Sequence, residues 1–272
     1  MLTVKTNYHQ HTTWCDGRDG VEAMILAAID RAFDEIGFSS HARLPTIEPG
    51  NLTPATAEGY AREVRELGRK YAPRISVRLG VEADYVAGET TPERGRYAGL
   101  GVEYVIGSVH WVRAGDGGLV CVDDTPERLA EGVALHFGGD ARAFVRAYFA
   151  QEREMALAFD FDVIGHPDLV RKFNGALALF DEADDWYREE LHLAADAFAA
   201  SGKIVEVNTG AIARGWMDDA YPSPEFRRLL RERGARFLLG SDAHSVDQLD
   251  CAFERFAPQE RFLPFLPLAF PR

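Results

Sequence analysis

Short runs of β-branched and other apolar residues alternate along the chain with longer segments whose apolar residues recur every three or four positions. The first pattern predicts strands and the second amphipathic helices, and their alternation is typical of βαβ units around a parallel sheet. Seven segments are predicted to be strands: 3–9, 35–40, 75–82, 104–110, 161–166, 204–208 and 237–242.

Helices are predicted between these strands at 21–33, 58–71, 125–136, 141–159, 184–200 and 226–233. The pairs Thr53-Pro54 and Ser223-Pro224 each offer a capping side chain followed by a proline suited to a first helical turn. Asp19, with Glu22 three residues on, resembles a capping box before the first helix.

Seven strand–helix units fit either a closed barrel or an open doubly wound sheet, and periodicity alone does not separate them. A barrel collects function at the C-terminal ends of many strands, whereas an open sheet concentrates it at one switch point. Almost every predicted strand here ends in a potential metal ligand. We therefore expect an α/β fold of the distorted TIM-like (β/α)7 barrel type, with its site at the C-terminal ends of the strands.

Composition limits the classes of protein to consider. Hydrophobic residues form 46% of the 272 residues and charged residues 27%, as in a globular protein with a sizeable core. No linker or change of composition marks a boundary, so one domain over 1–272 is expected. The net charge of -13 and the dispersed basic residues argue against binding to nucleic acid.

Location is also suggested by composition. Residues 1–7 are too few and too polar to form a signal peptide, and no run of about 18 apolar residues occurs, so neither export nor membrane insertion is expected. Cys15, Cys121 and Cys251 are isolated and lack the CxxC spacing of a structural zinc site. Together these features predict a cytoplasmic protein; the oligomeric state is not predicted.

Histidines and carboxylates recur where the predicted strands end. His9 and His11 lie two positions apart on an extended segment, so both imidazoles can face one ion. Six of the eight histidines lie at such ends, which favours a common site over six separate structural roles. The candidate metal ligands are His9, His11, Asp16, His41, Glu82, His110, His166, Asp242 and His244.

Nine ligands are more than one ion needs, so two or three divalent ions are expected. The mixture of nitrogen and oxygen donors suits Zn, Mn, Fe or Co better than Ca or Mg, which prefer oxygen. Glu82 and Asp242 are the natural bridging carboxylates. His136 and His192 lie in predicted helices and are expected to be ordinary structural residues, and Cys15 is interpreted as a small buried residue.

This ordered set resembles the polymerase and histidinol phosphatase (PHP) superfamily of metal-dependent phosphoesterases. The resemblance runs from His9 to His244 and includes Gly-His-Pro-Asp around His166 and the terminal Asp-Ala-His. Cys-Asp-Gly at 15–17, Gly-Ser-Val-His at 107–110 and Glu-Val-Asn-Thr at 206–209 are similar to the stand-alone histidinol-phosphate phosphatases of the superfamily.

The resemblance implies a seven-stranded barrel with up to three ions and a partition of the ligands. It implies His9, His11, Glu82 and Asp242 on one ion, Glu82, His110 and His166 on a second, and Asp16, His41 and His244 on a third. Glu82, Asp242 and His244 are the implied catalytic residues. In relatives an acidic residue often precedes the position of His41, where this chain has Ser39-Ser40, so the support of that histidine differs.

The expected reaction is hydrolysis of a phosphate monoester by water activated between metal ions. A phosphate dianion also needs cationic partners, and Arg171, Lys172 and Arg214 follow the fifth and sixth strands. Asn208, on the inward face of the sixth strand, is a further candidate for substrate contact. Asp168 either orients His166 or caps a turn.

Three alternatives remain open. The chain could be a PHP phosphoesterase for another ester, such as a nucleotide or sugar phosphate. It could be an amidohydrolase, which also begins with HxH, although Glu82 stands where a modified lysine would often bridge and His244 follows Asp242. It could be a non-catalytic PHP module, but such modules usually lose ligands, and here every position is filled.

Overall fold

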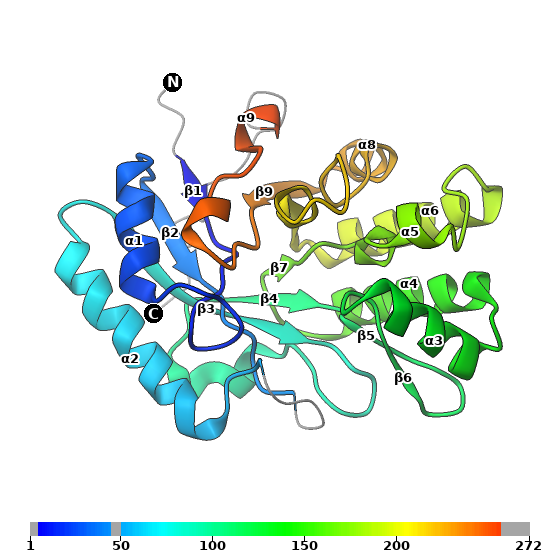
Figure 1. Cartoon of the computed structure of the whole chain (residues 1–272), viewed down its shortest axis with the longest axis horizontal. Coiled ribbons are helices and arrows are strands. Elements are labelled where there is room, and N and C mark those ends of the chain that lie inside the picture. The colour runs from blue at the N-terminus through cyan, green and yellow to red at the C-terminus, as the bar shows by residue number, and fades with distance from the viewer. Residues whose placement is uncertain (1–4, 45–49, 257–272) are drawn as a thin grey trace.

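The computed structural model describes residues 5–44 and 50–256. Its main sheet has seven strands in the order β1-β2-β3-β4-β7-β8-β9, each parallel to its neighbours (Figure 1). The strands are β1 Thr6–Asn7, β2 Glu35–Phe38, β3 Ser76–Asp84, β4 Tyr104–Ser108, β7 Val163–Ile164, β8 Ile204–Asn208 and β9 Arg236–Gly240. Beyond β1 and β9, Gln10 pairs with Ala243 in a parallel bridge, so the sheet is a nearly closed barrel.

All seven predicted strands are present, but several end earlier than predicted. The first ends at Asn7 rather than at 9, and the last ends at Gly240 rather than at 242. The backbone has a positive φ of 20° at His166 and 49° at Asp242, which interrupts strand geometry at the residues that enter the site. Residues 3–4 of the first predicted strand lie outside the described residues.

Helices pack around the outside of the barrel, and the six predicted ones are present (Figure 1). They are α1 Val21–Asp30, α2 Pro54–Tyr71, α3 Pro126–Phe137, α4 Ala141–Ala158, α6 Asp185–Ser201 and α8 Pro224–Glu232. Shorter elements are η1 Arg94–Leu100, η2 Leu169–Arg171, α5 Asn174–Leu177, α7 Gly210–Ala213, η3 Val246–Gln248 and α9 Phe253–Phe256. No helix in the described ranges has the length and apolar character needed to span a membrane.

Two of the three predicted helix caps are confirmed. Thr53 and Thr56 form a reciprocal capping box at the start of α2, and the Ser223 hydroxyl accepts from Phe226 N at 3.3 Å. The capping role of Asp19 is wrong: α1 begins after Gly20 without a side-chain cap. The Asp19 carboxylate instead accepts from Val246 N at 2.9 Å, which ties the start of α1 to the segment after β9.

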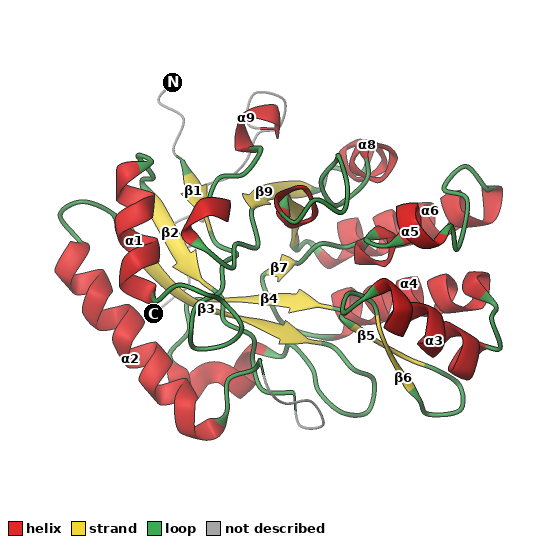
Figure 2. Ribbon diagram, viewed as in Figure 1, coloured by secondary structure: helices red, strands yellow, loops and turns green. Residues whose placement is uncertain are grey.

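An antiparallel hairpin, which the sequence analysis did not predict, lies between β4 and β7. It consists of β5 Trp111–Arg113 and β6 Leu119–Cys121, and it packs against α3 (Figure 2). Strands of three residues are too short to give a periodic signal. The hairpin places Trp111 and Cys121 beside the C-terminal ends of the barrel strands.

The lower part of the barrel interior is filled by apolar and aromatic side chains. They are Tyr8, Tyr104, Ile106, Val163, Ile204 and Leu238, and they form a cluster separate from the larger core that involves the helices. A Cβ atom on Gly80 would lie 2.3 Å from Cζ of Tyr104, so the ring requires glycine there. Because apolar side chains fill this part of the barrel, a polar site is expected at its C-terminal end.

Candidate metal centre

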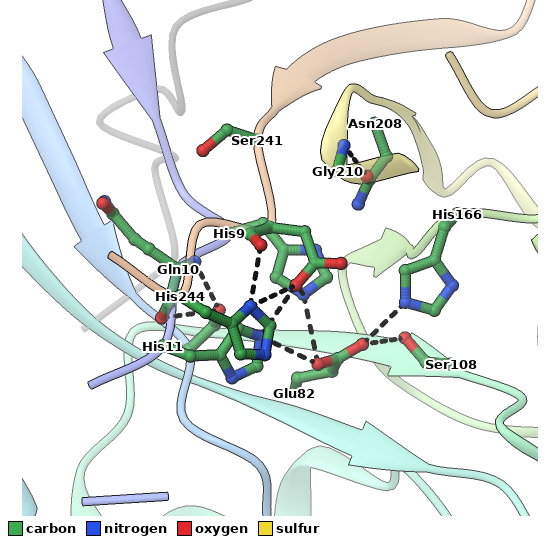
Figure 3. Close-up of polar contacts among 12 residues, drawn as sticks. His9, Gln10, His11, Glu82, Ser108, His166, Asn208, Gly210, Ser241 and His244 are labelled. Carbon is green, nitrogen blue, oxygen red and sulfur yellow. Dashed lines mark hydrogen bonds and ion pairs between the residues drawn. The ribbon is translucent and has the colours of Figure 1, made fainter. Parts of the chain in front are cut away.

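The nine predicted metal ligands come together at the C-terminal end of the barrel. Parallel strands end at the same edge, so side chains that follow β1, β2, β4, β7 and β9 converge on Glu82 of β3. Figure 3 shows His9, His11, His166 and His244 around Glu82. Asp16 approaches from the loop that follows β1.

Glu82 lies at the middle of this group and uses both of its oxygens. Oε2 lies 3.1 Å from His9 Nε2 and 3.3 Å from His11 Nε2. Oε1 lies 3.0 Å from His166 Nε2 and 3.5 Å from His110 Nε2. A carboxylate with imidazoles on both sides has the geometry of a bridge between two ions.

Asp242 and Asp16 complete the other ends of the group. Asp242 Oδ1 lies 3.1 Å from His11 Nε2, and the ligand atoms of His9, His11 and Asp242 all lie within 4.8 Å of one another. Asp16 Oδ2 lies 3.1 Å from His244 Nε2 and 3.7 Å from His41 Nε2. Asp16 is exposed, so the group that it forms with His41 and His244 lies on the solvent side of the site.

Several of these ligand atoms are placed to bind a cation rather than to form hydrogen bonds within the protein. His9 Nε2, His11 Nε2 and Glu82 Oε2 are buried and have no hydrogen-bond partner within the described residues. Unpaired polar atoms in a protein interior cost free energy, and native structures rarely keep them without a purpose. A divalent ion between these nitrogens and oxygens would satisfy all of them, so the residues present fit a metal site.

The electrostatics of the group agree with that fit. Burial alone would lower the pKa of His9, but Glu206, Glu82 and Asp242 outweigh it and raise this pKa to about 10. Burial and the nearby His11 lower the pKa of His244, so its ring is neutral at pH 7. Protons on His9 balance the carboxylates when no ion is bound, and metal binding would displace them.

Two carboxylates that the sequence analysis missed lie behind the histidines. Glu206 Oε1 is 2.8 Å from His9 Nδ1, and Asp84 Oδ1 is 2.8 Å from His110 Nδ1. A carboxylate on the far ring nitrogen fixes which nitrogen faces a metal. Asp84 lies two residues after Glu82 on β3 and therefore shares its face, a signal that alternation along the strand carried.

Two of the predicted substrate residues border the group. A cavity of about 120 Å³ is lined by His41, His110, Asp123, Lys172, Arg214, Asp242 and His244. Arg214 donates to Asp242 Oδ2 at 2.6 Å, and Lys172 Nζ donates to the backbone oxygen of Asp123 at 2.8 Å. Both cations therefore lie beside the place where an anion could meet bound metal.

The other two lie elsewhere. Arg171 pairs with Glu182 at 2.7 Å and with Asp168 at 3.5 Å, and it does not line this cavity. Asn208 is buried and donates to Glu206 Oε2 at 2.9 Å. Asp168 accepts from Ser223 N at 2.7 Å, whereas Nδ1 of His166 makes no hydrogen bond in the described chain, so Asp168 does not orient that ring.

A second cavity of about 340 Å³ adjoins the first and shares His41, His110 and Asp123 with it. Its described lining includes no lysine or arginine, but it includes Asp84, Asp123 and Asp124. Trp111 of the hairpin supplies an aromatic wall. This space therefore suits a group that is cationic and partly planar.

The remaining histidines lie away from the group, as expected. His136 pairs with Asp116 at 3.0 Å, and His192 contacts Arg233 at 3.1 Å. Cys15 was expected to be buried, but the residue is half-buried, and its Sγ lies 3.5 Å from His11 Nδ1 beside the site.

Comparison with known proteins agrees with the fold. A Deinococcus radiodurans protein named "Probable histidinol-phosphatase" is 33% identical over 258 residues, which cover 93% of this chain and 91% of that one. A crystal structure from Listeria monocytogenes, provisionally named histidinol phosphatase, has a TM-score of 0.82 at 22% identity and covers 93% of this chain and 100% of its own.

A histidinol phosphate phosphatase from Lactococcus lactis, solved with Zn, L-histidinol and phosphate, has a TM-score of 0.62 at 20% identity, over 89% of this chain and 87% of that one. At these identities the two crystal structures support the fold. The PHP domain model matches residues 7–210. With that match over most of its length and a relative at 33% identity, the chain belongs to the PHP domain family.

Proposed function

We propose that this protein is a metal-dependent histidinol-phosphatase, which hydrolyses L-histidinol phosphate to L-histidinol and phosphate in histidine biosynthesis. The observation that carries the proposal is the convergence of nine potential ligands beside a cavity lined by Lys172 and Arg214. The named relatives, which match over nearly their whole length, support the same activity.

We assign two or three divalent ions, Zn, Mn or Fe, to the nine side chains. His9, His11, Glu82 and Asp242 would hold one, Glu82, His110 and His166 a second, and Asp16, His41 and His244 a third. The contacts of Glu82 with both groups of imidazoles support the shared carboxylate. When bound, such ions increase the acidity of water and neutralise charge on the phosphoryl oxygens.

The residues of the chain then have separate tasks. Lys172 and Arg214 would bind non-bridging oxygens of the phosphate, and arginine suits this role because its planar group can donate two hydrogen bonds at once. Glu82, Asp242 and His244, the proposed catalytic residues, would hold the metal ions next to the phosphate. Water attacks phosphorus, the ester P–O bond breaks, and the alcohol oxygen takes up a proton to leave as histidinol.

The acid-lined cavity supports this ester over other phosphomonoesters. Histidinol carries a protonated amino group and an imidazole ring, which match Asp123, Asp124 and the Trp111 side chain. Sugar phosphates lack a positive charge in the leaving alcohol and would gain nothing from these acids. Arg171 and Asn208 we place outside substrate contact, because their described partners are protein carboxylates.

The test is phosphate release from histidinol phosphate compared with a nucleotide, a sugar phosphate and glycerol phosphate, using protein whose metal content is measured by elemental analysis. The His110→Ala variant serves as the control for contaminating phosphatases. We expect a strong preference for histidinol phosphate in kcat/KM. A preference for another ester would overturn the substrate, and a protein inactive on every ester when loaded with Zn, Mn or Fe would overturn the phosphatase.

A further inference from the structure

Strand β8 ends without a predicted metal ligand, yet one of its side chains reaches two of them. Glu206 is fully buried, and it contacts His9, which follows β1, and His166, which follows β7. Its side chain therefore connects residues that we assign to different ions. The role inferred for Glu206 rests on that proposed assignment of ligands, but not on the identity of the substrate.

The first oxygen of Glu206 governs His9. Oε1 lies 2.8 Å from Nδ1 of the ring, so the proton of a neutral His9 is held on Nδ1. The lone pair is then on Nε2, which lies 3.1 Å from Glu82 Oε2 and 3.7 Å from Asp242 Oδ1. Glu206 thus points the ligating nitrogen of His9 into the metal site.

The second oxygen of Glu206 governs His166. Oε2 accepts from the backbone N of His166 at 3.0 Å and from Asn208 Nδ2 at 2.9 Å. His166 has a φ of 20°, a conformation that is sparsely populated and needs support from its surroundings. The bond to Oε2 supplies that support and holds the ring with Nε2 3.0 Å from Glu82 Oε1.

Strand β9 leaves space for this carboxylate. A Cβ atom at Gly240 would lie 1.9 Å from Glu206 Oε1 and 3.2 Å from Cβ of His9. Gly240 therefore lets Glu206 lie directly behind His9. This contact offers a second way to perturb Glu206, because a methyl group at 240 would move the carboxylate without removing its charge.

We propose that Glu206 is a positioning residue that couples two metal ions, because one carboxylate orients the ligand His9 on one side of Glu82 and His166 on the other. It is not a ligand itself, since both of its oxygens already accept from protein donors. Loss of Glu206 lowers the affinity for both ions together. Among the described residues Asp84 bonds His110 and neither His9 nor His166, so its loss lowers the affinity for the second ion without the paired effect on the first.

The experiment uses the full chain, freed of metal and titrated with Co²⁺ alone. Wild type is compared with Glu206→Gln, Gly240→Ala and Asp84→Asn, and bound cobalt is followed by elemental analysis and by its visible absorption. An amide has one accepting oxygen where Glu206 uses two, and its NH2 group would face another N–H donor, so we expect the Gln side chain to shift and disturb the support of both His9 and His166. We expect Glu206→Gln to weaken two cobalt sites together by about 10- to 100-fold, and Asp84→Asn to weaken one.

Gly240→Ala separates position from charge and is expected to weaken the same two sites as Glu206→Gln. Circular dichroism of the metal-free variants establishes whether each one folds. If Glu206→Gln does not fold, the Gly240→Ala variant provides the test. Cobalt binding of wild-type affinity and spectrum in a folded Glu206→Gln or Gly240→Ala variant would overturn the proposal, as would the loss of a single site. Because substrate is absent, a mistaken substrate would leave these outcomes unchanged.

Discussion

At the scale of single residues, the cavity next to the predicted ligands contains two cations that an anionic substrate could reach. Lys172 is nearly buried, with Nζ 3.4 Å from Asp123 Oδ2. Arg214 is paired with Asp242, and its Nε has no hydrogen-bond partner in the described chain. Each cation therefore has N–H groups that can donate hydrogen bonds to a phosphate.

We expect Lys172→Ala and Arg214→Ala each to lower kcat/KM for histidinol phosphate by about 10- to 100-fold. A hydrogen bond to a charged group contributes about 1.5–3 kcal/mol, and each 1.4 kcal/mol corresponds to a factor of ten. Steady-state phosphate release measures the change. Lys70→Ala, which removes an exposed cation paired with Glu22, is the matched control. Unchanged kinetics in both cavity variants would exclude the assigned phosphate contacts.

A buried acid on α4 gives a test of pH dependence. Burial raises the pKa of Glu152 well above its ordinary value of 4.5, although Tyr148 donates to it at 2.9 Å. As pH rises through 4.5, the unfolded chain releases this proton while the folded chain keeps it. The folded state therefore loses stability with rising pH until its own raised pKa is reached.

Glu152→Gln should remove that loss, because the amide stays neutral in both states. We expect the thermal midpoint of the variant to exceed that of wild type by a few degrees at pH 8 and by less at pH 5, since 1 kcal/mol corresponds to about 2–4 °C for a chain of this size. Glu189→Gln, at an exposed position, serves as the control. An equal difference at both pH values would contradict a raised pKa.

The structure brings together all nine residues that the sequence identified, because each lies near or beyond the C-terminal end of a strand and the strands share one direction. The sequence analysis missed Glu206 and Asp84, whose importance depends on which ring nitrogen they face. It also could not separate Lys172 from Arg171, because adjacent residues after a strand point in different directions and only the tertiary structure decides which one lines the cavity.

At the scale of elements, apolar periodicity was enough to find the seven strands and six long helices. Strand ends were less accurate, because the positive φ values at His166 and Asp242, just after β7 and β9, are set by tertiary contacts that local pattern does not encode. The hairpin β5–β6 was missed for its short strands. It matters for function because Trp111 and Cys121 line the acid-lined cavity.

The position of that hairpin depends on a close contact with α3. A Cβ atom at Gly118 would lie 2.1 Å from Nδ1 of His136, and that ring also bonds Asp116 in the hairpin turn. We expect Gly118→Ala to displace the hairpin and raise KM for histidinol phosphate by about tenfold, since such overpacking costs about 1–3 kcal/mol. Eight of the nine assigned ligands lie outside the hairpin, and His110, which directly precedes β5, is also held by Asp84, so kcat should change less.

Gly115→Ala is the matched control for this prediction. Gly115 lies in the same turn, and a Cβ atom there would meet nothing within 4 Å. Steady-state kinetics on both variants, with cobalt content measured alongside, separates a moved hairpin from a lost ion. Equal KM values in the two variants would contradict a role for the hairpin in holding the alcohol part of the substrate.

At the scale of the whole molecule, closure of the barrel accounts for the density of ligands. The bridge between Gln10 and Ala243 brings the segment after β1 against the segment after β9, so His11 and Asp242 meet although 231 positions separate them. In the sequence, the proximity of His11 and Asp242 could be inferred only because potential ligands recur at the strand ends. That the full 1–272 chain is one domain remains a prediction, supported by one main core across the described residues.

The group around Glu82 is expected to hydrolyse a phosphate ester only when it holds metal ions. The most direct test removes metal with a chelator, counts the ions left per chain, and follows phosphate release from histidinol phosphate before and after Zn²⁺, Mn²⁺ or Fe²⁺ is returned. We predict two or three ions per chain, a loss of at least about 100-fold on removal and recovery on return. Undiminished hydrolysis by metal-free protein would contradict the account.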